Sequence, residues 1–129
     1  ISENHVIVAS SNDLDKYAFD QAAIILENNG LKVTRFPIQG YVKFKGIKLA
    51  ANYLNYLITN NAIILPGFDL ALDKKAIEFM QPFFPNRKVV SVNTKTLWYN
   101  GGGIHCVTND IPKVAEKSID CKVCKEQCL

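Results

Sequence analysis

The chain has 129 residues, of which 48% are hydrophobic and 21% are charged, with a formal net charge of +3. This is the length of one domain with its own hydrophobic core, and the composition is ordinary for a globular protein. The basic residues are scattered, and neither a long apolar run nor a signal-peptide pattern is present, so we expect no nucleic acid, no membrane and a cytoplasmic location.

The first third of the chain predicts a strand, a helix and a second strand. Residues 5–9 form a short apolar run, and residues 10–13 supply side-chain oxygens that can cap a helix. Apolar side chains recur at helical spacing over residues 14–27, before an Asn-Asn-Gly sequence that commonly ends helices. Residues 31–36 alternate as a half-buried strand does. We therefore expect a β-α-β unit in which His5 is structural.

The middle of the chain predicts a loop followed by a hairpin. Residues 39–50 are rich in lysine and glycine and predict a loop, either a solvated connector or a cover over a site. Residues 53–59 and 62–65 predict two paired strands joined at two asparagines. Asn55 lies in the first of these strands among apolar and aromatic neighbours. Because its amide must be hydrogen bonded, Asn55 has either a structural bond or a role in a site.

The second half of the chain repeats the order of the first. Residues 69–73 predict a turn and cap, the apolar residues from 76 to 83 form a helical face, and residues 88–92 predict a strand. Residues 94–100 predict a loop that carries Trp98. Two such units alone leave open sheet edges and half-covered faces, so we expect them to belong to a larger assembly. Because the chain begins without Met, we expect an excised or processed piece.

A glycine run leads into a histidine and a cysteine near the C-terminal end: Gly101, Gly102, Gly103, Ile104, His105 and Cys106. Consecutive glycines allow a ligand to approach the backbone closely. A single cysteine displayed by such a loop is a candidate nucleophile. The alternative is a buried, inert cysteine after an ordinary glycine turn. If residues 104–108 are extended, the His105 side chain points away from the sulfur, which favours a structural or positioning role.

Three stretches together resemble the C-terminal part of the agmatine deiminase and bacterial peptidyl-arginine deiminase family: ANYLNYLITNNAIILPGF, FFPNRKVVSVN and GGGIHCVT. The similarity covers roughly residues 4–112. It implies an α/β fold of repeated ββαβ modules, the C-terminal part of a pentein-type α/β propeller with the active site in a central channel. It also implies hydrolysis of a guanidinium group to a ureido group and ammonia, without a cofactor.

The resemblance also implies roles for individual residues. Cys106 falls on the nucleophile, Asn55 on a polar substrate-binding residue, and Gly101, Gly102 and Gly103 on the loop beside the substrate. The family's histidine, in a His-x-Asp motif, and its further acidic residue have no counterpart in this sequence. We expect these groups to lie upstream, in N-terminal modules of the same protein, and we expect the isolated chain to be inactive.

The chemistry explains why these groups are needed together. Two carboxylates hold the guanidinium so that its central carbon lies over the sulfur. The thiolate attacks that carbon to give a thiouronium intermediate, and the histidine protonates the departing ammonia and then activates water. Trp98 either stacks on the flat guanidinium through a cation–π contact or packs on the core.

The sequence leaves alternatives open for both the substrate and the function. Residues 109–111, Asn-Asp-Ile, stand where agmatine-type enzymes usually have glutamines before the proline, and the lead-in that contains Trp98 also differs. We expect agmatine as the substrate first and peptidyl-arginine second. The rival from another class is a non-catalytic α/β binding module with a metal-binding cysteine tail.

The tail is a separate segment, so we divide the chain into deiminase-like modules at residues 1–113 and a cysteine-containing tail at residues 114–129. Cys121, Cys124 and Cys128 lie in this tail with no fourth ligand in view. Structural zinc usually takes four ligands, a disulfide leaves one thiol over, and an iron–sulfur cluster needs a ligand from elsewhere. A lysine-rich end without a metal is the remaining interpretation.

Overall fold

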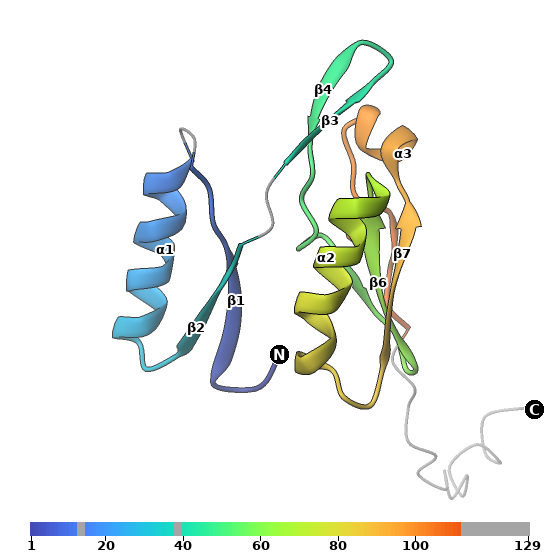
Figure 1. Cartoon of the computed structure of the whole chain (residues 1–129). Coiled ribbons are helices and arrows are strands. Elements are labelled where there is room, and N and C mark those ends of the chain that lie inside the picture. The colour runs from blue at the N-terminus through green and yellow to red at the C-terminus, as the bar shows by residue number, and fades with distance from the viewer. Residues whose placement is uncertain (13–14, 38–39, 112–129) are drawn as a thin grey trace, which may run out of the picture.

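A computed structural model describes residues 1–12, 15–37 and 40–111 (Figure 1). Its first unit consists of strand β1 (His5–Ala9), helix α1 (Lys16–Asn28) and strand β2 (Lys32–Phe36). The two strands pair in parallel from His5 opposite Lys32 to Ala9 opposite Phe36. Helix α1 covers one face of this sheet, which confirms the predicted β-α-β unit.

The two ends of α1 differ in how well the sequence anticipated them. The residue before the helix is Asp15, and its side chain makes no capping hydrogen bond. The cap predicted over residues 10–13 stays a prediction, because residue 13 lies outside the described residues. At the other end, Gly30 has a φ of 80°, a left-handed conformation that glycine adopts without strain. The predicted Asn-Asn-Gly stop is confirmed.

The lysine-rich segment at residues 39–50 was wrongly predicted as a loop. It forms an antiparallel hairpin of β3 (Tyr41–Phe44) and β4 (Ile47–Ala50). Lys45 and Gly46, with φ values of 49° and 78°, supply the two left-handed residues of a tight hairpin turn. The lysines obscured the strand pattern because they lie on exposed positions.

The second unit contains β5 (Leu57–Ile58), β6 (Ala62–Gly67), α2 (Leu70–Met80), the 3₁₀ turn η1 (Gln81–Phe83) and β7 (Lys88–Asn93). Strand β6 pairs antiparallel with β5 and parallel with β7. The hairpin and the last strand are thus confirmed. Helix α2 starts earlier than its apolar pattern suggested, because the Asp69 side chain accepts hydrogen bonds from the first backbone N–H groups of the helix.

The predicted strand over residues 53–59 is mostly wrong, since only Leu57 and Ile58 pair. The segment before them turns inward. The Asn52 side chain accepts a hydrogen bond from the Leu54 N–H at 3.1 Å, a local turn that competes with strand pairing. Tyr53 is 1% exposed and belongs to the core. Asn55 is therefore carried on a bend rather than on a strand.

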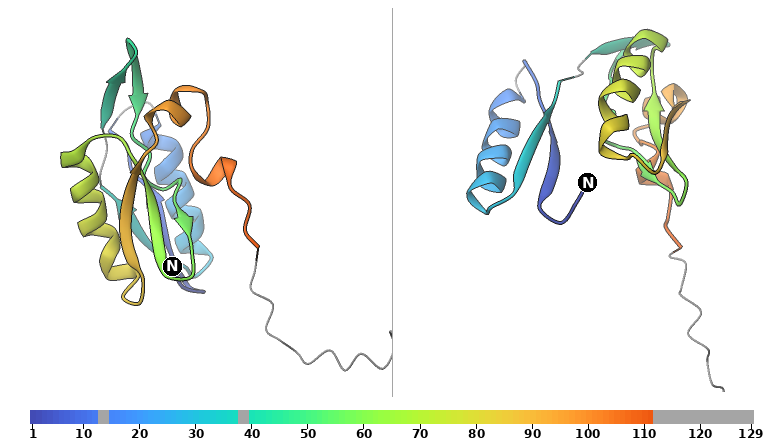
Figure 2. Two further views of the ribbon diagram at one scale, coloured as in Figure 1. Left: turned by 90° about the vertical axis from the view of Figure 1, so that its right-hand side faces the viewer. Right: turned by 60° about the horizontal axis from the view of Figure 1, so that its bottom comes forward.

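Helix α2 lies between the two parallel-strand pairs, as the views in Figure 1 and Figure 2 show. The Phe79 ring contacts Phe36 with centroids 5.1 Å apart, and the Phe83 ring contacts His5 at 5.8 Å. His5 also shares a hydrogen bond of 2.7 Å with Thr34. These contacts give His5 the structural surroundings that were expected, and they join the two units.

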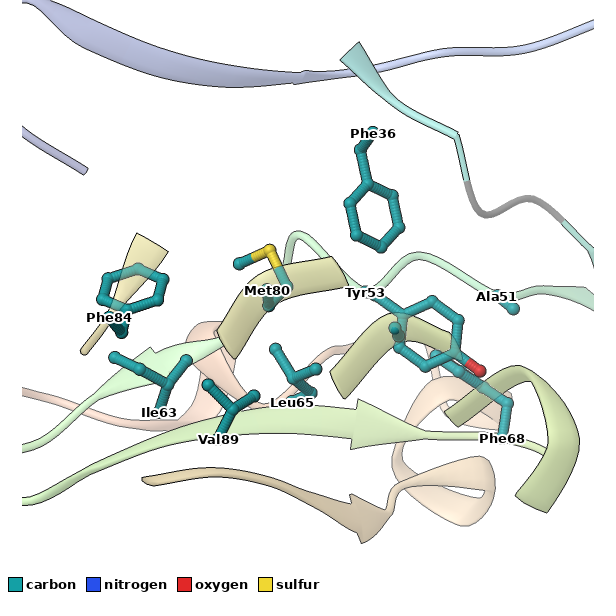
Figure 3. Close-up of a cluster of buried hydrophobic side chains, with 10 residues drawn as sticks. Phe36, Ala51, Tyr53, Ile63, Leu65, Phe68, Met80, Phe84 and Val89 are labelled. Atoms are coloured by element: carbon teal, nitrogen blue, oxygen red, sulfur yellow. The ribbon is translucent and has the colours of Figure 1, made fainter. Parts of the chain in front are cut away.

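The hydrophobic core lies around β6, β7 and α2 (Figure 3). Ile63, Leu65 and Met80 are completely buried there. The remaining buried members of the cluster are Phe36, Ala51, Tyr53, Phe68, Ala76, Phe84 and Val89. The core thus fixes the position of the Tyr53 segment on one side and of the end of β6 on the other.

After β7, residues 94–100 form the short helix α3 (Lys95–Tyr99) instead of the predicted loop. The Thr94 N–H donates to the Gly67 carbonyl at 3.0 Å, so the end of β6 holds the start of this helix. The Trp98 N–H in turn donates to the Thr94 carbonyl at 2.8 Å. Helix α3 therefore delivers the glycine run from a fixed point on the sheet.

Candidate active site

Cys106 lies on a 3₁₀ turn, η2 (His105–Val107), directly after the glycine run. The Thr108 hydroxyl donates to the carbonyls of Ile104 and His105 at 3.0 and 3.2 Å and stabilises the turn. The condition considered from the sequence, an extended conformation over residues 104–108, is therefore not met. The reason is local, because a threonine that bonds back to earlier carbonyls favours a turn over a strand.

The Asn55 side chain contacts this turn with both ends of its amide. Its Nδ2 donates to the Cys106 Sγ across 3.2 Å, and its Oδ1 accepts the His105 backbone N–H across 2.9 Å. Residues 51 positions apart in the sequence are thus brought together. His105 takes part through its backbone, which is a positioning role that does not depend on where its ring points.

The Cys106 side chain is exposed, which contradicts the alternative of a buried, inert cysteine. Hydrogen bonding from the Gly103 backbone lowers the pKa of the Cys106 thiol, and the bond from the Asn55 side chain lowers the pKa further. Partial desolvation acts in the opposite direction and is the smaller effect. Donors directed at the sulfur favour the thiolate, which is the nucleophilic form.

The three glycines serve different purposes. Gly101 has a φ of 88°, a conformation in which other residues are strained. Gly103 is buried, and a Cβ there would overlap the Asn55 amide and lie 2.5 Å from the Trp98 ring. Gly102 has neither restriction, since its nearest neighbour is a Val107 methyl at 3.7 Å. At Gly103 the Asn55 side chain approaches the backbone closely, and the predicted place of the three glycines beside a substrate stays a prediction.

Trp98 packs edge-on against Phe68, with ring centroids 5.4 Å apart. The same residue lines a cavity of about 310 Å³, together with Phe36, Tyr53 and Leu54. The core-packing alternative for Trp98 is thus seen directly. Stacking of Trp98 on a guanidinium stays a prediction.

Sequence reasoning missed one feature beside the site, the pair of Tyr53 and Asp73. The Tyr53 hydroxyl donates to the Asp73 carboxylate across 2.6 Å inside the core. An aspartate four residues after a helix cap is typical of an exposed first turn, so only the tertiary structure shows its burial.

Metal binding by the cysteine tail stays a prediction. Among residues 1–12, 15–37 and 40–111, no group of three His, Cys, Asp or Glu side chains is arranged to hold a metal ion. Cys121, Cys124 and Cys128 lie outside the described residues. In the same part of the chain, no helix combines the length and apolarity that a bilayer crossing requires.

Comparison with known proteins gives consistent results. Residues 2–112 match the family model described as Porphyromonas-type peptidyl-arginine deiminase. A protein of Marinomonas sp. (strain MWYL1) named "Putative agmatine deiminase" is 44% identical over 68 residues, which are 53% of this chain and 18% of the relative. A protein of the same name from Photobacterium profundum is 40% identical over 88 residues, 68% of this chain and 23% of the relative.

Solved structures of agmatine deiminases are similar in fold to this chain. The agmatine deiminase of Enterococcus faecalis superposes with a TM-score of 0.64 at 26% identity, over 84% of this chain and 37% of that one. The agmatine deiminase of C. jejuni has a TM-score of 0.69 at 22% identity, over 82% and 33%, and shows the shared fold. The chain therefore spans between 18% and 37% of the length of these proteins. Because the family model matches most of the sequence, from residue 2 to residue 112, the chain belongs to the Porphyromonas-type peptidyl-arginine deiminase family.

Proposed function

We propose that this chain is the C-terminal part of a hydrolase that converts a guanidinium group to a ureido group and ammonia, with Cys106 as the nucleophile. The observation that carries the proposal is the exposed Cys106 sulfur at the end of the Asn55 hydrogen bond. The lowered pKa of this thiol supports the same role, because a larger thiolate fraction is available at neutral pH.

In the proposed reaction, the thiolate forms a bond to the central guanidinium carbon, and one carbon–nitrogen bond breaks. The departing nitrogen takes a proton and leaves as ammonia, which gives a thiouronium intermediate. Water then adds to the same carbon, loses a proton to the base, and the sulfur–carbon bond breaks to return the thiolate. Asn55 stabilises the negative charge of the thiolate before the attack, and again when the sulfur–carbon bond breaks and the charge returns to the sulfur.

The remaining catalytic groups belong, in this proposal, to other modules of the same protein. The sequence contains no His-x-Asp motif to supply the base. The order β5, β6, α2, β7 is that of one ββαβ module, which supports a pentein-type propeller completed by further modules. In that arrangement the tail at residues 114–129 is a separate segment.

The substrate we propose first is agmatine, because the curated relatives named above carry that substrate in their names. Peptidyl-arginine is the second candidate, supported by the description of the matching family model and by the Asn-Asp-Ile sequence at residues 109–111.

The test is covalent labelling of the longer protein that contains this chain, with a haloacetamidine that mimics the guanidinium. We expect one label on Cys106, slower labelling in the presence of agmatine, and none in Cys106→Ser. Protection by an arginine-containing peptide but not by agmatine would select the second substrate. Labelling of the tail cysteines alone would support the non-catalytic binding module instead. The isolated chain should give no ureido product.

A further inference from the structure

Asp73 is a buried carboxylate that accepts three hydrogen bonds at the start of α2. One of its oxygens, Oδ1, accepts the Tyr53 hydroxyl at 2.6 Å, the Phe68 N–H at 2.9 Å and the Asp69 N–H at 3.2 Å. The side chain sits at the N-terminal end of the helix, where a negative charge is favoured. A carboxylate removed from water in this way needs each of these donors.

The other carboxylate oxygen of Asp73, Oδ2, is packed closely against Gly67. A Cβ added at Gly67 would lie 2.9 Å from Asp73 Oδ2 and also 2.9 Å from the Val92 carbonyl. Glycine at this position therefore creates the space that the carboxylate fills. Its place is fixed by β6 and β7 as well as by its donors.

The first connection from Asp73 to the thiol runs through Tyr53. Tyr53 is 1% exposed, and its ring packs against Phe68 with centroids 5.4 Å apart (Figure 3). Burial, followed by the Asp73 hydrogen bond, raises the pKa of Tyr53, so the hydroxyl stays protonated and acts as the donor. Asn55 follows two residues later on the same bend and donates to the Cys106 sulfur.

The second connection runs through Phe68. Its N–H is bound to Asp73, its ring contacts Trp98 edge-on, and the Trp98 ring lies against Gly103. The Gly103 backbone is the second donor to the Cys106 sulfur. The two donors that lower the pKa of the thiol most, Gly103 and Asn55, are therefore linked to the same buried carboxylate by short series of contacts.

We propose that Asp73 is a positioning residue for the Cys106 nucleophile, acting through Tyr53 and Phe68 on two of the donors to the sulfur, Asn55 and Gly103. The inference rests on the proposed function of Cys106, and it assigns Asp73 no contact with the substrate. Asp73 fixes the positions of Asn55 and Gly103 relative to the sulfur, and these positions determine how readily the Cys106 thiol ionises.

A matched control lies at the opposite end of the same helix. The Gln81 side chain also makes three hydrogen bonds, to the Phe84 and Arg87 carbonyls at 3.1 and 2.9 Å and from the Val89 N–H at 3.0 Å. These bonds hold the link between α2 and β7 and contact neither Asn55 nor the glycine run. Gln81→Leu therefore reports what a general loss of stability does to the thiol.

The experiment measures the rate at which iodoacetamide alkylates Cys106 as a function of pH, with peptide mass mapping to separate Cys106 from the tail cysteines. The variants are Tyr53→Phe, Asp73→Asn, Asp73→Leu and Gln81→Leu in the full chain, each checked for folding by its circular dichroism. In Tyr53→Phe and Asp73→Leu we expect the midpoint of the rate-against-pH curve to move to higher pH. Near neutral pH, alkylation should be about threefold slower in Tyr53→Phe and slower still in Asp73→Leu. Asp73→Asn retains an oxygen acceptor and should recover part of the rate.

An unchanged midpoint in folded Tyr53→Phe would overturn the proposal, and so would an equal shift in Gln81→Leu. Tyr53→Phe keeps the buried ring, so it remains informative even where Asp73→Leu does not fold. Iodoacetamide requires no guanidinium chemistry. If the pH midpoint of iodoacetamide alkylation shifts but haloacetamidine does not label Cys106, the positioning role of Asp73 stands and the deiminase function is contradicted. If haloacetamidine labels Cys106 but the midpoint does not shift, the deiminase function stands and the positioning role is contradicted.

Discussion

The two β-α-β arrangements of this chain share a topology and differ in how their helices are held. Helix α1 follows Asp15, whose side chain makes no capping hydrogen bond, and the helix exposes Tyr17, Ile24 and Ile25. Helix α2 is capped by the Asp69 side chain and lies between two sheets. The candidate site is built on the second unit, where the helix start and the strand end are both fixed by buried hydrogen bonds.

This difference shows that the order of elements does not by itself create a site. In the first unit, Arg35 of β2 donates to the Phe19 carbonyl of the helix at 2.6 Å and pairs with Asp20 at 2.5 Å. Both partners are partly exposed to water. The second unit places Asp73 inside the core instead, and precise positions near the thiol follow from that burial.

The largest expected effect is on the free energy of unfolding, and it compares a buried residue of α2 with an exposed residue of α1. Met80 is completely buried, so Met80→Ala should lower the free energy of unfolding by about 2–5 kcal/mol through lost burial and a residual cavity. The matched change on the first helix is Ile25→Ala, at a side chain 60% exposed, which should cost less than about 0.5 kcal/mol. Urea unfolding of both variants measures the contrast, and similar losses would contradict it.

The next effect concerns the close approach at Gly103. Gly103→Ala places a methyl group where the Asn55 amide and the Trp98 ring lie, which should cost about 1–3 kcal/mol and displace the donor from the sulfur. Alkylation of Cys106 near neutral pH should slow along with the loss of stability. Gly102→Ala meets only ordinary contact with Val107 and serves as the control. Equal behaviour of the two variants would show that Gly103 is not special.

A third prediction concerns pH. Because the Asn55 donor lowers the pKa of Cys106, Asn55→Leu should raise that pKa and move the alkylation profile to higher pH. At neutral pH the rate should fall about threefold to tenfold, and at strongly alkaline pH the variant and the parent should react alike. A uniform decrease at every pH would indicate a blocked thiol rather than a changed pKa.

The smallest effect compares the helix caps. Asp69→Ala removes the acceptor of the Ala71 and Leu72 N–H groups and should cost about 1 kcal/mol. Asp15→Ala removes no capping bond and should be close to neutral. Thermal unfolding followed by circular dichroism checks the pair, and an equal loss in both would contradict the assigned caps.

The sequence predicted those elements whose signals are local. Strands β1, β2, β6 and β7 were anticipated from apolar runs bounded by turn residues, and the stop of α1 from Gly30. The hairpin of β3 and β4 was missed because its exposed positions carry lysine. Helix α3 was missed because five residues are too few for a helical period to appear.

The candidate site was predictable as residue types and not as geometry. Cys106 and Asn55 were singled out, but their contact joins positions 51 apart, which no local pattern encodes. The turn at Cys106 depends on the Thr108 hydroxyl, whereas Val and Thr in sequence favour a strand. Asp73 carries the same side chain as an ordinary exposed residue of a first helical turn, and only the surrounding fold buries it.

The Asn55–Cys106 bond ties chemical reactivity to completion of folding. In an unfolded chain the thiol has no such donors, so its pKa is that of an ordinary cysteine. Newly synthesised chains therefore carry an ordinary, sluggish sulfur until the bend with Asn55 docks against the glycine run. Local unfolding that separates Asn55 from Cys106 would remove this donor and raise the pKa of the thiol again.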